Sequence, residues 1–167
     1  PNAGGSALAN VALNAYVNLH GSPMLDAAAA ARTAGNSPNT SLCSAVSILG
    51  PGMVAPSREA ARTLIDLFRE TGLSDPEDEK FDISEIMKQA SYQEQAAKLT
   101  GETPDARGEA MLTGIKARGV KSIFVQLLRS LAKQSGRHPT ADAVLAAICC
   151  HLAWRPLVLK RLSLTTA

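Results

Sequence analysis

The sequence has little of several residue types that would point to particular functions. Aromatic residues make up only 4% of the chain, and its lysines and arginines are dispersed rather than gathered with aromatics into a stripe. Such a stripe is typical of nucleic-acid-binding proteins, so we expect no nucleic-acid partner. No apolar run approaches the roughly 20 residues that a membrane-spanning helix needs, and no signal peptide is recognisable. We therefore expect a globular protein without a membrane partner.

Cysteine is also scarce. The three cysteines are Cys43, Cys149 and Cys150, and none belongs to a C-x-x-C pair. A zinc site is therefore not expected, and we expect neither a metal nor a tightly bound cofactor. All three cysteines lie in apolar segments with helical periodicity, which predicts buried free thiols. Their odd number and placement indicate a reducing compartment, so we expect a cytoplasmic protein. The first residue is Pro1 rather than methionine, which is compatible with a fragment or a processed product.

What the chain does have is abundant alanine and leucine, the residues with the best helix propensity. Hydrophobic residues make up 46% of the sequence, which is enough for a core, and the net charge is only +2. Apolar residues recur at helical spacing, and no segment reads as a strand. We predict one all-α domain over residues 1–167, with no sheet and about eight helices at 7–20, 24–34, 40–49, 58–71, 82–95, 105–117, 121–134 and 141–153.

Local signals set the expected helix ends. Ser57 and Thr140 stand where N-caps are favoured, and Asp82 with Glu85 has the spacing of a capping box. The segment Gly50–Gly52 reads as a turn between two helices.

Taken singly, the polar residues favour structural roles. A lone histidine is usually structural or solvated, as we expect for His138 and His151, and Asp142 by itself would be a first-turn acid that favours the helix dipole. No P-loop, nucleophile elbow or dinucleotide fingerprint is present.

The order of several short segments gives a more specific interpretation. These segments are LHGSP at 19–23, SAVSILGP at 44–51, PDARGE at 104–109 and TADAVLAA at 140–147. In this order they resemble the D-H-G, G-P-x-H-G, D-P-R-A-E and N-V-D-G-A-L-A-A segments of the citrate synthase/citryl-CoA lyase superfamily. The resemblance spans about residues 10–155, and it implies large-domain-like helices over 7–72, a possible small-lobe region over 81–135 and a return helix over 140–167.

The resemblance also implies roles for particular residues. Asp142 matches the aspartate that removes a proton from the acyl-CoA methyl group. His20 and Arg107 match residues that bind the carboxylate substrate, and Arg161 corresponds to a later family arginine. Met53 stands where the family has the histidine that donates to the thioester oxygen.

This sequence departs from the family in its catalytic donors. Met53 cannot donate a hydrogen bond. The second catalytic histidine of the family has no counterpart near residues 95–100, where Lys98 is the nearest polar candidate. Each lost donor typically lowers the rate by about 10²–10³.

Two hypotheses follow from different functional classes. One is a divergent enzyme that acts on a coenzyme A thioester. The other is a non-catalytic descendant, a pseudoenzyme that serves as a binding or assembly module. The resemblance implies a homodimer, or a heterodimer with a related subunit, that pairs through the apolar helices of residues 7–49.

Overall fold

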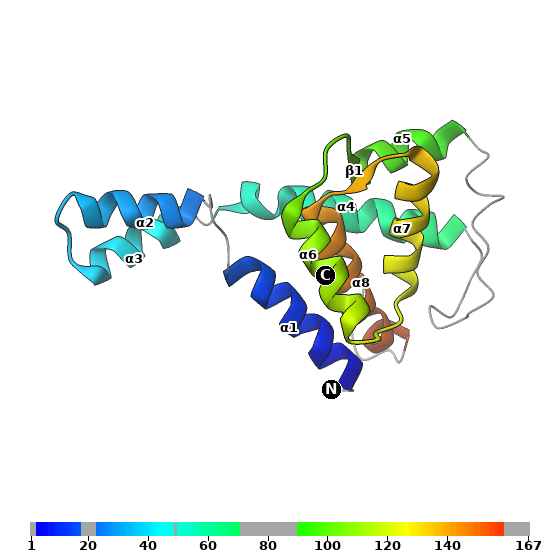
Figure 1. Cartoon of the computed structure of the whole chain (residues 1–167), viewed down its shortest axis with the longest axis horizontal. Helices are drawn as coiled ribbons and strands as arrows, with labels where there is room; N and C mark the ends of the chain where they lie inside the picture. The colour runs from blue at the N-terminus through cyan, green and yellow to red at the C-terminus, as the bar shows by residue number, and fades with distance from the viewer. Residues whose placement is uncertain (1–2, 18–22, 49, 71–89, 159–167) are drawn as a thin grey trace.

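The computed structural model describes residues 3–17, 23–48, 50–70 and 90–158, and within them the chain is almost entirely helical (Figure 1). The prediction of an all-α fold with about eight helices is confirmed. The described helices are α1 (Ala3–Val17), α2 (Pro23–Thr33), α3 (Pro38–Ser47), α4 (Pro51–Glu70), α5 (Ala90–Leu99), α6 (Ala106–Ala117), α7 (Ile123–Ser135) and α8 (Ala141–Val158).

A short ladder is the one departure from the predicted fold class. Strand β1 (Thr100–Gly101) pairs antiparallel with β2 (His138–Pro139), so that Thr100 faces Pro139 and Gly101 faces His138. The sequence predicted no strand, since two-residue strands carry no periodicity to detect. The ladder joins the end of α5 to the start of α8, and it therefore helps to place the residues that open α8.

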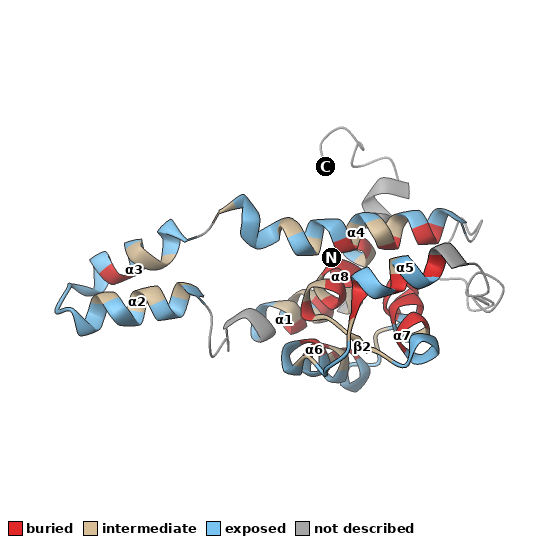
Figure 2. Ribbon diagram, turned by 90° about the horizontal axis from the view of Figure 1, so that it is seen from above, coloured by how far each residue is buried: buried red, intermediate tan, exposed pale blue. Residues whose placement is uncertain are grey.

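The core is built around α8. Helices α4, α6 and α7 pack against it, and α1 packs on α6 and α8. Figure 2 shows the buried positions concentrated on α7, α8 and the facing sides of α4 and α5. Helix α7 supplies the most regular apolar face, and the Phe124 ring lies 5.2 Å from that of Phe68 on α4, measured between centroids. The contact between Phe124 and Phe68 joins the two apolar faces whose periodicity predicted these helices.

Helix α4 begins earlier than the sequence indicated. We expected a turn at Gly50–Gly52 and an N-cap at Ser57, but Pro51 is the first residue of the helix and Ser57 lies inside it. Proline is favoured at a first helical position, because its missing N–H would be unsatisfied there in any case. Pro56 lies within the helix, where it removes one further backbone donor and its ring crowds the preceding turn.

The first half of α4 lies outside the core. Its buried residues are Ala60, at the middle of the helix, and Leu64, Leu67 and Phe68 in the second half. At its far end, Glu70 accepts a hydrogen bond from the hydroxyl of Tyr92 on α5. The second half of α4 is thus fixed to the body, while the first half extends toward α2 and α3 (Figure 1).

Helices α2 and α3 form a hairpin that projects from the body (Figures 1 and 2). They pack mainly against each other and make no comparable contact with the other described helices. No residue of α2 is buried, and Ser41 is the one buried residue described in α3. We call residues 23–48 the arm.

The prediction that all three cysteines are buried is wrong for two of them. Cys43 and Cys149 are exposed, and Cys150 alone is buried. Cys43 belongs to the arm, which has almost no interior, so apolar neighbours in sequence did not bury it. Burial, followed by the neighbouring Cys149, raises the pKa of Cys150 to about 12.

The capping box predicted at Asp82 and the first part of the helix predicted over 82–95 lie outside the described residues. In the part of the chain that is described, no helix is long and apolar enough to cross a membrane.

Candidate functional site

The start of α8 brings together segments that are far apart in the sequence. Thr140 caps this helix, as predicted, because its Oγ1 accepts a hydrogen bond from the backbone N–H of Ala143 at 3.2 Å. The Thr140 backbone N–H in turn donates to the Leu99 carbonyl at 3.2 Å. The first turn of α8 is therefore fixed from both sides, and it presents Asp142 toward α4.

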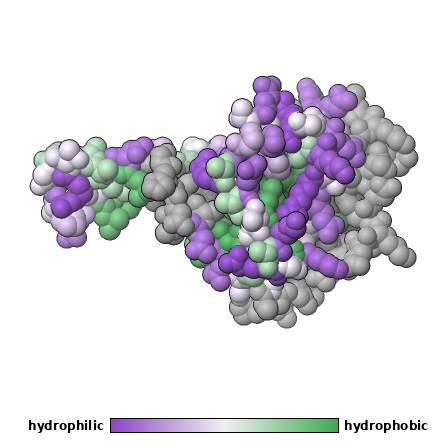
Figure 3. Space-filling view, viewed as in Figure 1, coloured by the Kyte–Doolittle hydropathy of each residue, from purple (hydrophilic) through white to green (hydrophobic). Residues whose placement is uncertain are grey.

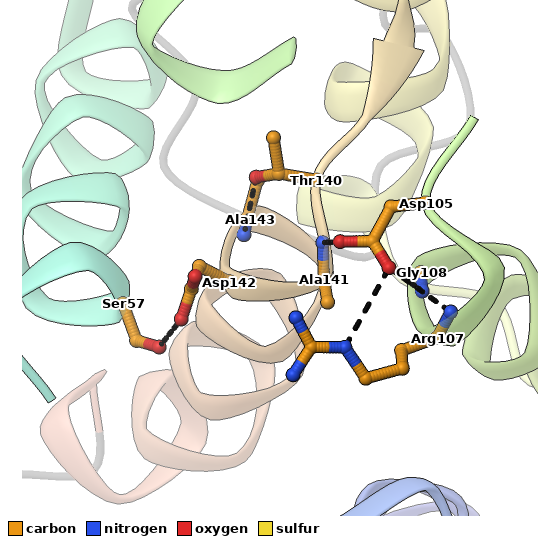
Figure 4. Close-up of polar contacts among 8 residues, drawn as sticks. All are labelled: Ser57, Asp105, Arg107, Gly108, Thr140, Ala141, Asp142 and Ala143. Carbon is orange, nitrogen blue, oxygen red and sulfur yellow. Dashed lines mark hydrogen bonds and ion pairs between the residues drawn. The ribbon is translucent and has the colours of Figure 1, made fainter. Parts of the chain in front are cut away.

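Asp142 is paired with a residue that the sequence did not single out for the site. Ser57 Oγ of α4 donates a hydrogen bond to Asp142 Oδ1 at 2.5 Å, and the contact is partly buried. Figure 4 shows the two side chains pointing toward each other across the space between their helices. A short hydrogen bond to a carboxylate is stronger than one between neutral groups, so this pair also links the first half of α4 to α8.

Asp105 joins the start of α6 to the start of α8. Its Oδ1 accepts from the backbone N–H groups of Arg107 at 3.0 Å and Gly108 at 3.4 Å, while its Oδ2 accepts from Ala141 N–H at 2.9 Å. One carboxylate therefore satisfies donors at two helix N-termini, where donors lack partners within the helix and negative charge is favoured.

The pKa of Asp105 reflects these contacts. Burial by itself would raise it, but the backbone donors of Ala141, Arg107 and Gly108, together with the Arg107 guanidinium, hold the pKa below its ordinary value. Asp105 is therefore an anion tied into the structure, and its main role is to hold the two helix starts together.

Arg107 lies at the same end of the body. Its Nε is 3.7 Å from Asp105 Oδ1, and about half of its side chain, 54%, is exposed. Figure 4 shows the guanidinium reaching from α6 toward the first turn of α8, on the side where Asp142 lies. An exposed guanidinium has donors left for a second carboxylate, because it carries five N–H groups in a planar fork.

Met53 is one helical turn before Ser57 on α4, so the two residues share a face of that helix. Its side chain is 37% exposed. Arg107 and Asp142 thus lie at the joined starts of α6 and α8, and the hydrogen bond from Ser57 brings the α4 face that also carries Met53 against Asp142. Their assigned roles stay predictions.

Of the other predicted residues, only Lys98 lies in the described part of the chain. His20 and Arg161 lie outside the described residues. Lys98, the polar candidate nearest to the missing second histidine, is an exposed residue of the last turn of α5.

Sequence reasoning missed the parts played by Ser57 and Asp105. Ser57 was read as a helix cap because serine before a charged, alanine-rich segment is a common start signal. Asp105 was seen only as part of a motif, although an Asp two residues before Arg-Gly has the position of an N-cap for α6. No sequence signal could have shown that its second oxygen reaches α8.

The chemistry open to this group is limited. The Ser57 hydroxyl already donates a hydrogen bond to Asp142. In this arrangement the hydroxyl is therefore not available as a donor to a substrate oxygen. In the described residues, no group of three or more His, Cys, Asp or Glu side chains is placed to hold a metal ion. The group can therefore offer a carboxylate, a cation and an adjacent apolar helix face.

Comparisons with known protein families, with curated proteins and with solved structures found no match for this chain.

Proposed function

We propose that the chain is a divergent citrate synthase/citryl-CoA lyase-like protein that binds an acyl-CoA thioester and a carboxylate at the start of α8, with weak or no ordinary turnover. The observation that carries the proposal is the hydrogen bond between Ser57 and Asp142. This bond joins Asp142 on α8, the base that the resemblance implies, to the face of α4 that also carries Met53. Met53 stands where the resemblance implies a histidine that donates to the thioester oxygen.

The charges support binding of an acid. Arg107 has an exposed guanidinium beside the start of α8, and a guanidinium binds carboxylates with two parallel hydrogen bonds. Asp105 competes for this cation at 3.7 Å, a distance longer than a direct hydrogen bond. A substrate carboxylate with better geometry would therefore have donors left to use.

The same group argues against rapid catalysis. Methionine offers no donor to the oxygen on which charge develops when a thioester is deprotonated, and the proton of Ser57 is already engaged with Asp142. Enolate formation needs that charge to be stabilised in the transition state. Binding without fast turnover is the expected behaviour.

The binding test is calorimetric titration of the whole chain with acetyl-CoA and with free CoA, followed by oxaloacetate. Arg107→Ala should weaken oxaloacetate binding, because the guanidinium is lost. Arg118→Ala is the matched control, since it removes an exposed arginine from the opposite end of α6. Absence of binding by both CoA compounds would contradict the proposal.

A thiol-release assay with acetyl-CoA and oxaloacetate tests turnover, which should be negligible. Activity on the order of 1–10³ per second that disappears in Asp142→Ala would show that another donor replaces the family histidine. Ser57→Ala is the companion variant, because it removes the hydrogen-bond partner of Asp142 and leaves the Asp142 carboxylate in place.

A second candidate function, an assembly module, is favoured by the arm. Residues 23–48 project from the body and bury almost nothing of their own (Figure 2). We propose that the chain forms a homodimer, or a heterodimer with a related subunit, through this region. If the CoA compounds do not bind while the chain associates, assembly is the better description of its function.

A further inference from the structure

The arm has an outward surface on each of its helices. On α2, the partly buried positions 24, 27, 28 and 31 recur at helical spacing and leave a continuous exposed face. This outer face is formed by Leu25, Asp26, Ala29, Ala30, Arg32 and Thr33. On α3, Leu42 and Val46 are one turn apart, with 65% and 54% of their surface exposed. Figure 3 shows hydrophobic side chains along the arm between its tip and the body.

These helices are too short to be stable alone. α2 has 11 residues and α3 has 10, and isolated helices shorter than about 12–15 residues are marginal in water. Packing of one helix on the other buries a single described residue, Ser41. A covering partner would supply the apolar burial that normally stabilises amphipathic helices.

The charges of the arm indicate what the partner is. Between residues 21 and 57 the only charged side chains are Asp26 and Arg32, and both are exposed. They lie three residues before and three residues after Ala29. A two-fold axis at Ala29 between two antiparallel copies of α2 would therefore bring Asp26 of each copy to the level of Arg32 of the other.

The residues between the two charges fit such a contact. Positions 27–31 are all alanine, and small side chains let helix backbones approach closely. The arm carries no net charge, so two copies do not repel each other as like-charged surfaces would. A symmetric interface must be self-complementary, and the outer face of α2 has this property.

We propose that the outer face of α2 is a self-docking surface, on which a second copy of this chain binds antiparallel about Ala29 with reciprocal Asp26–Arg32 pairs. This inference rests on the pairing proposed above and specifies the partner and the geometry.

Charge reversal tests the proposed pairs by sedimentation over a range of concentrations. Asp26→Arg alone and Arg32→Asp alone each place like charges opposite each other, and should raise the dimer dissociation constant by roughly ten-fold or more. The double variant restores opposite charges and should dimerise like the unchanged protein. An equimolar mixture of the two single variants should also associate, because every pair in the mixed dimer is again attractive.

The outcomes separate the two proposals. A chain that stays monomeric at every concentration overturns the pairing itself. A chain that dimerises, with single variants that dimerise equally well, overturns only the α2 geometry. Circular dichroism of each variant checks that it folds, which is expected because both side chains are exposed.

Crosslinking gives an independent measurement. In a background that lacks both exposed cysteines, Cys43→Ser with Cys149→Ser, Ala29→Cys should form an intermolecular disulfide on mild oxidation, because residue 29 of each copy faces itself at the axis. Thr33→Cys is the matched control on the same face. Its two copies would lie about 12 Å apart along the helix axis, given a rise of about 1.5 Å per residue, which is beyond disulfide reach. Equal crosslinking at both positions would overturn the proposed axis.

Discussion

At the residue scale, Asp105 shows how one side chain can fix two helix starts relative to each other. Its two oxygens accept hydrogen bonds from the starts of α6 and α8. Arg107 and Asp142 lie next to those starts. The arrangement of the proposed binding residues therefore depends on a carboxylate that would not itself contact the substrate.

Replacement of this carboxylate should reduce stability in a pH-dependent manner. Asp105→Ala should lower the free energy of unfolding at neutral pH by about 1–3 kcal/mol, because a helix cap is lost and a partly buried donor is left unpaired. The folded-state pKa is lowered, so the stabilisation is present above the unfolded value of about 3.9 and is lost as the pH falls through the folded-state pKa. The two proteins should thus become similar in acid.

Urea unfolding curves from neutral pH to about pH 3 provide the measurement. The control is Glu109→Ala, which removes another acid from the first turn of α6. If Asp105 stabilised the protein only as a negative charge near the start of α6, Asp105→Ala and Glu109→Ala would lose stability equally. A difference between Asp105→Ala and the unchanged protein that does not depend on pH would contradict this account.

At the scale of elements, the junction between α6 and the start of α8 is closely packed around Gly108. A Cβ at this position would come within 2.9 Å of the Pro139 carbonyl oxygen and 3.2 Å of the Ala141 nitrogen. Both of these atoms belong to backbone, which cannot move aside as a flexible side chain can. Gly108 therefore allows α6 to approach α8 closely enough for the Asp105 bridge.

Gly108→Ala should separate the two helix starts. We expect it to destabilise the protein by about 1–3 kcal/mol, as overpacking commonly does, and to weaken any binding at the start of α8. Gly52→Ala is the matched control, since its Cβ would meet no atom within 4 Å and alanine favours the helix by roughly 0.5–1 kcal/mol. Thermal melting of both variants measures the contrast. A Gly108→Ala protein as stable as the unchanged chain would show that the junction can widen freely.

At the scale of the whole molecule, burial is unevenly distributed. Helices α4, α7 and α8 supply most of the buried core residues, with smaller contributions from α1, α5 and α6, whereas the arm has almost no interior (Figure 2). Regions with few buried apolar contacts open with a low free energy. Local stability should thus fall from the body to the arm.

Hydrogen exchange can test this difference and its dependence on pairing. At low protein concentration, amides of α2 and α3 should exchange much faster than those of α7 and α8. At high concentration their protection should rise, because a ligand that binds the folded state stabilises it by mass action, and here the ligand is a second copy. Protection of the arm that equals that of α8 at every concentration would contradict this view.

The sequence by itself determined the helical fold and the approximate position of most helices. Its evidence was local, as in the apolar face of α7 and the cap at Thr140, and such signals act within one or two turns of the chain. These local signals gave wrong predictions where one residue type is compatible with two structures. Pro51 could end a loop or begin a helix, and Ser57 could cap a helix or lie inside one.

The tertiary structure decided which residues meet. Asp142 was predicted from a motif, but its partner Ser57 is 85 residues away in the sequence, and no periodicity links positions so far apart. The same holds for the bridge from Asp105 to Ala141 and for the exposure of the arm. Local propensity determines where a helix forms, whereas contacts between helices depend on how all of their apolar faces are buried at once.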